Sequence, residues 1–258
     1  MADFIEKLQA SGIYGFRKSD LDGILNLSDK ALKSLISRQV KAGKAIHLRS
    51  GYYAVVPAEY RDSGAPPASW FIDGLMRHLN RSYYVGLLSA AELYGAAHHK
   101  PQVFQVVTDT SDRPVIAGRN HIRFYRSSTI AESQTVLRNT PTGYMLVSSV
   151  EQTLIDLVLY ISECGGSGNT VTVFSELAPE AKPARLRSIL KKQNTPVVQR
   201  VGLLLEAADQ LKLSGIAEVI LSNRTSRKVR LVGGSNFKAN EYSERWKVKY
   251  SGSLEPEA

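Results

Sequence analysis

Six basic residues lie between positions 30 and 49, and no acidic residue interrupts them. They are Lys30, Lys33, Arg38, Lys41, Lys44 and Arg49, and the side chains of Ser34, Ser37 and His47 lie among them. Lysine and arginine offer hydrogen-bond donors and positive charge, which suits phosphate, and arginine also pairs bidentately with guanine. The series therefore predicts non-covalent binding of a polyanion. The formal net charge of +9 agrees with this, because excess positive charge attracts phosphate polymers.

The first part of this series has the signals of one amphipathic helix, from residue 28 to 42. Ser28 is a preferred N-cap residue, and Gly43 suits the left-handed position that follows a helix. The apolar positions Ala31, Leu32, Leu35, Ile36 and Val40 form one stripe, and the opposite side carries Lys30, Lys33, Ser34, Ser37, Arg38 and Lys41. We expect this opposite side to face solvent. The alternative to a binding surface is an ordinary solvated helix face.

Two shorter helical segments precede this helix, at 3–11 and 18–25, and a hairpin follows it. The β-prone segments 45–48 and 52–56 flank the turn Arg49-Ser50-Gly51. Helices followed by a hairpin are the order of a winged helix-turn-helix, whose helix before the wing enters the major groove. Base edges would then meet Ser34, Ser37 and Arg38, and phosphates would meet Lys30, Lys33, Lys41, Lys44 and Arg49. The hairpin, with Lys44, His47 and Arg49, would lie against the DNA backbone or in the minor groove.

Four helix- and strand-breaking residues mark a domain boundary: Pro57, Gly64, Pro66 and Pro67. We predict a winged helix-turn-helix domain over 1–57, a linker over 58–69 and a larger mixed α/β domain over 70–258, an α+β chain overall. In the last domain the spacing of apolar residues predicts helices at 70–79, 87–97, 149–163, 183–193, 196–212 and 214–219. Strands are predicted at 103–108, 122–125, 218–222, 228–232 and near 246–250. The run Gly165-Gly166-Ser167-Gly168 is expected to be a flexible break.

A second basic region lies in this larger domain. It contains Arg185, Arg187, Lys191, Lys192 and Arg200, and a third region follows from Arg224 to Arg230. These residues could extend a DNA footprint, bind RNA, meet an acidic protein partner or form a solvated surface.

Enzymatic signatures are missing from the sequence. Glu180-Ala181-Lys182 fits a nuclease-like Glu-x-Lys pattern, but prolines bracket it and disfavour the strand that such a site requires. Metal-ligand spacing is absent as well, since the adjacent His98 and His99 would point apart on a helix. We therefore predict no catalytic residue, no metal, no cofactor and no enzyme activity. With one cysteine, Cys164, and no signal peptide or membrane span, we expect a cytoplasmic protein.

Several stretches taken together resemble the AbiEi-type antitoxins of bacterial type IV toxin–antitoxin and abortive-infection systems, which act in phage defence. These stretches are the wing at 49–55, residues 83–99 (Tyr-Tyr-Val-Gly-Leu-Leu-Ser-Ala-Ala-Glu-Leu-Tyr-Gly-Ala-Ala-His-His), 103–108, 149–157 and 199–205. The resemblance implies a winged-helix repressor that binds inverted repeats in its own operon promoter. It also implies a C-terminal domain that counters a nucleotidyltransferase-like toxin, with or without direct contact. A winged-helix-targeted nucleic-acid-processing enzyme and a ligand-responsive transcription factor are the alternatives.

Overall fold

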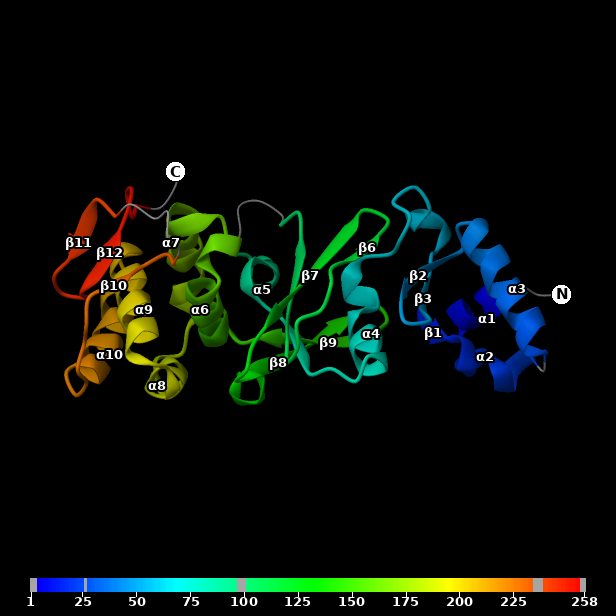
Figure 1. The fold of residues 1–258 in the computed structure, drawn as a ribbon, viewed down its shortest axis with the longest axis horizontal. Coiled ribbons are helices and arrows are strands. Elements are labelled where there is room, and N and C mark those ends of the chain that lie inside the picture. The colour runs from blue at the N-terminus through cyan, green and yellow to red at the C-terminus, as the bar shows by residue number, and fades with distance from the viewer. Residues whose placement is uncertain (1–3, 26, 97–100, 234–238, 256–258) are drawn as a thin grey trace. The chain divides into compact units, whose positions relative to one another are not determined.

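The computed structural model describes residues 4–25, 27–96, 101–233 and 239–255 of the 258-residue chain. It is a mixed α+β structure whose chain divides into two compact units. The first unit comprises residues 1–85, 102–132 and 136–147, and the second comprises 86–101, 133–135 and 148–258. Figure 1 shows the helices and strands of both units.

The first unit begins with three helices and three short strands. In order these are α1 (Phe4–Ala10), β1 (Gly15–Arg17), α2 (Lys18–Leu25), α3 (Asp29–Lys41), β2 (Ala45–Arg49) and β3 (Tyr52–Val55). The strands form an antiparallel sheet in the order β1-β3-β2. The helices and the sheet share a small core that includes Phe4, Leu8, Phe16, Leu32 and Ile36. This core holds α3 against the sheet and leaves its other side to solvent.

The rest of the first unit is a six-stranded mixed sheet in the order β6-β7-β5-β4-β9-β8. Its strands are β4 (Tyr83–Val85), β5 (Phe104–Thr108), β6 (Val115–Ala117), β7 (Asn120–Arg126), β8 (Thr135–Thr140) and β9 (Gly143–Ser148). The predicted strands at 103–108 and 122–125 are confirmed by β5 and β7. Helix α4 (Ile72–His78) joins this sheet through a hydrogen bond of 2.9 Å from the Tyr83 hydroxyl to Asp73.

Residues 58–69, expected to be a linker, are packed inside the first unit. The Ser63 carbonyl accepts from the Arg119 backbone N–H at 2.9 Å, and the Pro66 carbonyl accepts from the Asn120 side chain at 2.9 Å. Gly118 lies so close to this segment that a Cβ there would overlap its backbone. The prolines and Gly64 therefore shape a turn against β6 and β7, and the division of the chain by contacts does not fall at 58–69.

The second unit contains six α-helices and a small sheet within its described residues. They are α5 (Leu87–Leu93), α6 (Val150–Leu159), α7 (Gly166–Leu177), α8 (Pro183–Lys192), α9 (Thr195–Ala207) and α10 (Leu211–Leu221), with β10 (Val229–Arg230), β11 (Glu241–Ser243) and β12 (Val248–Tyr250). Two predictions were wrong. The run 165–168 was expected to be a flexible break, but Gly165 is the N-cap of α7 and residues 166–168 are its first residues; Val171, Phe174 and Leu177 of this helix are buried. Residues 218–222, expected to be a strand, lie at the end of α10.

Candidate nucleic-acid interface

Helix α3 has the two ends that its sequence predicts. The Ser28 hydroxyl accepts a hydrogen bond from the Ala31 backbone N–H at 3.3 Å, which satisfies an N-terminal donor of the helix. At the other end Gly43 has φ +66°, its N–H donates to the Val40 carbonyl, and the Lys44 N–H donates to the Gln39 carbonyl, each at 3.0 Å. This pair of bonds is a Schellman motif, and it confirms the predicted glycine cap.

The predicted solvent-facing side of α3 is exposed along its whole length. Leu32 and Ile36 are buried beneath it. The exposed residues follow the 3–4 residue spacing of one helix face: Lys30, Lys33, Ser34, Ser37, Arg38 and Lys41. The face extends over three turns, about 16 Å at 1.5 Å per residue. It therefore presents four cations and two small hydroxyls in a form that a groove of duplex DNA could accept.

The acidic residue Asp29 borders this face. It was not predicted to be part of the surface because it lies just before Lys30, the first residue of the basic series. Asp29 pairs with Lys18 and, at 2.8 Å, with Lys33. Hydrogen bonds from Lys18 and then Lys33 lower the pKa of Asp29 to about 2. All three side chains are at least one-third exposed, and such surface pairs contribute little to stability. A phosphate group could therefore replace Asp29 beside Lys33 at small cost.

The predicted hairpin turn is present, with both central residues left-handed. Ser50 has φ 50° and Gly51 has φ 77°, which is the geometry of a type I′ turn that matches strand twist. His47 is exposed, accepts at Nε2 from the Gly51 N–H at 3.3 Å, and lies 5.1 Å from the Tyr53 ring. Lys44, at the start of the hairpin, is half-buried. His47 and Lys44 thus remain on the surface beside α3.

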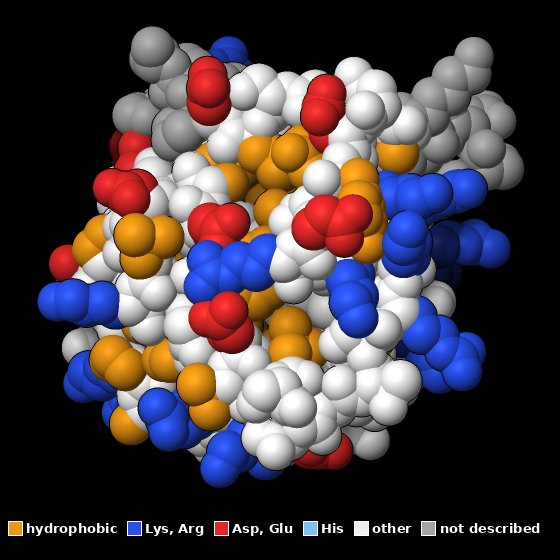
Figure 2. All heavy atoms as spheres, turned by 90° about the vertical axis from the view of Figure 1, so that its left-hand side faces the viewer, with side chains coloured by type: hydrophobic (Ala, Val, Ile, Leu, Met, Phe, Trp, Pro, Cys, Tyr) orange, Lys and Arg blue, Asp and Glu red, His pale blue; other side chains and the backbone are white. Residues whose placement is uncertain are grey.

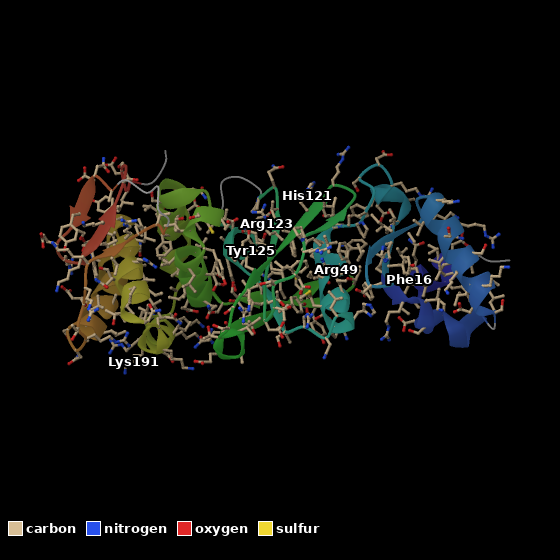
Figure 3. All side chains as sticks on the ribbon, viewed as in Figure 1. Phe16, Arg49, His121, Arg123, Tyr125 and Lys191 are labelled. Carbon is tan, nitrogen blue, oxygen red and sulfur yellow. The ribbon has the colours of Figure 1, made fainter. Side chains whose placement is uncertain are left out.

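Arg49 departs from the expectation of a free cation at the wing tip. Its side chain is only 19% exposed, and its guanidinium lies 3.1 Å from the Asp112 carboxylate. It also donates to the Arg113 carbonyl at 2.5 Å and lies over the Phe124 ring at 5.8 Å. Arg49 is labelled in Figure 3. Arg49 was predicted to contact phosphate, and in this structure partners 63 or more residues away in sequence occupy its guanidinium instead.

The tip of the hairpin is held against the same unit by two further contacts. His78 Nε2 lies 2.9 Å from the Ser50 carbonyl, and its ring stacks on Tyr52 at 5.3 Å. The Tyr52 hydroxyl fits between Gly15 and Gly74, where a Cβ on either glycine would overlap it. Burial raises the pKa of Tyr52 to about 12. The hairpin is therefore docked on α4 and the six-stranded sheet, a contact that no local sequence signal indicates.

The second basic region is centred on α8. Arg185, Arg187, Lys191 and Lys192 are exposed on this helix, and none of them has an ion pair among the described residues. Lys191 is labelled in Figure 3, and Figure 2, which looks onto the second unit, shows Lys and Arg side chains gathered along one side of that face.

Two arginines, one from the second basic region and one from the third, have structural partners instead. Arg200 is half-buried, donates to the Arg230 carbonyl at 2.8 Å, and has its pKa lowered by burial. Arg224 donates to the Gln193 and Lys191 carbonyls, each at 2.7 Å, and so joins the segment 224–230 to the end of α8. Arg200, which was predicted to join this basic surface, is thus less exposed than the cations on α8.

Features of an enzyme centre are not found among the described residues. No group of three or more His, Cys, Asp or Glu side chains that could hold a metal occurs in that part of the chain. Cys164 is buried, and burial raises the pKa of its thiol well above the usual range, which suppresses the reactive thiolate. His98 and His99 lie outside the described residues. No helix in the described part is long and apolar enough to cross a lipid bilayer.

Comparisons with known proteins identify a family domain that includes residues of both units. Residues 84–207 match the model of the AbiEi antitoxin C-terminal domain. The crystal structure of the RV2827C protein from Mycobacterium tuberculosis has a TM-score of 0.70 over 96% of this chain and 90% of that chain. The two chains are 15% identical, so this likeness establishes the fold alone. A comparison with curated proteins gave no match. By this match, which supports an AbiEi-type antitoxin family, residues 84–207 are an AbiEi antitoxin C-terminal domain.

Proposed function

We propose that this chain is the cytoplasmic antitoxin of a type IV toxin–antitoxin system and represses its own operon by binding promoter DNA. In this proposal residues 1–57 are a winged helix-turn-helix domain that reads DNA, and residues 70–258 carry the antitoxin function against a nucleotidyltransferase-like toxin. The observation that carries the DNA-binding part is the exposed basic face of α3, capped at both ends and supported by a core. The antitoxin part is supported by the family match.

The residues of α3 divide by their chemistry. Arg38 lies between Ser34 and Lys41 on the exposed face, and its planar fork can pair with the O6 and N7 of guanine. Ser34 and Ser37 are short enough to let the helix approach base edges. Lys30, Lys33 and Lys41, with Lys44 and His47 on the hairpin, would contact phosphates and set the position of the helix along the duplex. The α8 residues would add phosphate contacts outside the reading helix.

Fluorescence anisotropy with a duplex from the chain's own promoter tests this assignment. We expect Arg38→Ala to weaken operator binding by about 1–3 kcal/mol and to relax preference at one base pair. Lys33→Ala should weaken operator and unrelated duplexes alike, and should reduce the slope of log K against log salt by about 1.

Lys7→Ala is the matched control, because Lys7 is an exposed lysine on α1 of the same unit. It should leave affinity within about twofold, as a surface change away from the interface does. Equal affinities for the wild type, Arg38→Ala and Lys33→Ala would remove α3 as the reading helix.

Antitoxin action is tested separately in cells that express the neighbouring toxin gene. The full chain with Lys33 and Arg38 both changed to alanine should still restore growth, because neither residue lies in the matched span of 84–207. Loss of rescue with this stably folded double variant would show that DNA reading and toxin neutralisation cannot be separated.

A further inference from the structure

Asp112 lies between two arginines of the first unit. Its carboxylate, 16% exposed, lies 3.1 Å from the Arg49 guanidinium and 3.5 Å from Nε of Arg81, and it accepts from the Thr110 hydroxyl at 3.0 Å. Arg49 comes from the wing, whereas Asp112 belongs to the loop between β5 and β6. The Asp112 carboxylate thus links Arg49, the last cation of the predicted DNA-binding series, to the loop between β5 and β6.

Asp29 and Asp112, two acids that touch this series, differ in how firmly they hold their partners. Asp29 and Lys33 are 58% and 68% exposed, so water and salt weaken their attraction. Asp112 and Arg49 are 16% and 19% exposed, and the Arg113 carbonyl holds the same guanidinium. Attraction between charges increases as water is excluded from around them. A DNA phosphate therefore displaces Asp29 readily but competes with Asp112 at a disadvantage.

We propose that Asp112 withholds Arg49 from DNA and thereby limits the affinity of the wing for the phosphate backbone. This inference rests on the proposed DNA-binding function and adds a residue that sets its strength. Arg49 ends β2, the strand that follows α3, so its guanidinium is a further cation that the hairpin could add to the predicted DNA-binding series. While the Asp112 carboxylate holds Arg49, the wing packs against the six-stranded sheet and adds no phosphate contact through Arg49. When the charge of that carboxylate is removed, Arg49 becomes available to a phosphate.

A double-mutant cycle on Arg49 and Asp112 tests the inference. Asp112→Asn keeps the shape of the side chain and removes its charge, and we expect it to tighten promoter binding about three- to tenfold at low salt. The slope of log K against log salt should steepen by about 0.9, the value for one added phosphate contact. Arg49→Gln alone should change affinity less than about twofold, because Asp112 already holds Arg49. In the Arg49→Gln, Asp112→Asn double variant the gain should disappear.

Asp109→Asn is the matched control, since Asp109 lies in the same loop and contacts the Thr108 hydroxyl rather than an arginine in the described contacts. It removes the same charge and should not steepen the salt slope. An effect of Asp112→Asn equal to that of Asp109→Asn, or a gain that persists in the double variant, would overturn the inference.

Thermal unfolding of each variant shows whether the wing stays folded. Should Asp112→Asn fail to fold, the promoter affinity of Arg49→Gln alone tests the inference. A loss of affinity of more than about fivefold would mean that Arg49 already contacts DNA in the wild type, and this would overturn the inference. Wild-type protein that does not bind its promoter would overturn the proposed function together with this inference. Wild-type binding with an unchanged Asp112→Asn affinity overturns the inference alone.

Discussion

Gly202 is a residue at which a single methyl group matters. It lies in the interior of α9, and a Cβ there would overlap the six-membered ring of the buried Trp246. We expect Gly202→Ala to lower the free energy of unfolding by about 1–3 kcal/mol, the usual cost of overpacking. Gly215 in α10 is the control, because no atom lies within 4 Å of its added Cβ. Gly215→Ala should raise stability by about 0.5–1 kcal/mol. Urea unfolding measures both variants. Equal changes in their free energy of unfolding would contradict the close packing of Trp246 on α9 at Gly202.

Asp29 offers a test by pH at the same scale. Its pKa is lowered from 3.8 to about 2 by Lys18 and Lys33, so its ion pairs are complete above about pH 4 and are lost as pH falls toward 2. We expect a carboxyl-carbon NMR titration to give a midpoint near 2, and Lys33→Ala to move it upward. A midpoint near 3.8 in the wild type would show that these ion pairs do not form in solution.

Helix α3 shows what local sequence signals predict at the scale of an element. We expect Ser28→Ala to destabilise the first unit by about 1 kcal/mol, since it removes the acceptor for the Ala31 N–H. Ser34→Ala, on the exposed face, should leave stability within about 0.5 kcal/mol. Differential scanning calorimetry on the two variants measures this. Similar unfolding temperatures for both would argue against the cap.

Elements whose signals are local were predicted well, and those that depend on distant partners were not. Ser28, Gly43 and the turn Ser50-Gly51 each have a short-range reason for their conformation, so α3 and the hairpin follow from them. The three-residue strand β1 is defined by pairing with β3, more than thirty residues later, and no periodicity reveals it. For α7, the glycine run masked a helix whose apolar residues begin only at Val171.

The same distinction holds for the candidate interface. The exposed face of α3 was predictable because amphipathic spacing determines which side of a helix is buried. The commitment of Arg49 to Asp112 was not, because it depends on a loop 63 residues away.

At the scale of the whole molecule, the packing of the hairpin changes how a truncation should be designed. A chain that starts at residue 70 lacks the Ser50 carbonyl and Tyr52 ring that contact His78, and it lacks Tyr14, which packs on Trp70. We expect residues 70–258 to unfold at a lower temperature than the full chain and to expose Trp70, seen as a red-shifted fluorescence. Unchanged thermal stability of this fragment would show that the N-terminal elements do not support the rest of their unit.

The position of Trp246 has a consequence for minimal fragments at the other end of the chain. The family match ends at residue 207, yet Trp246 fills the hollow over Gly202, and the Gln199 side chain donates to the carbonyls of Trp246 and Arg227. Expression of the matched span alone would expose the apolar surface of α9 that Trp246 covers. It would also leave the two side-chain amide hydrogens of Gln199 without their acceptors. We expect such a surface to self-associate. The shortest fragment that stays folded and monomeric should therefore extend through Tyr250, the last residue of β12.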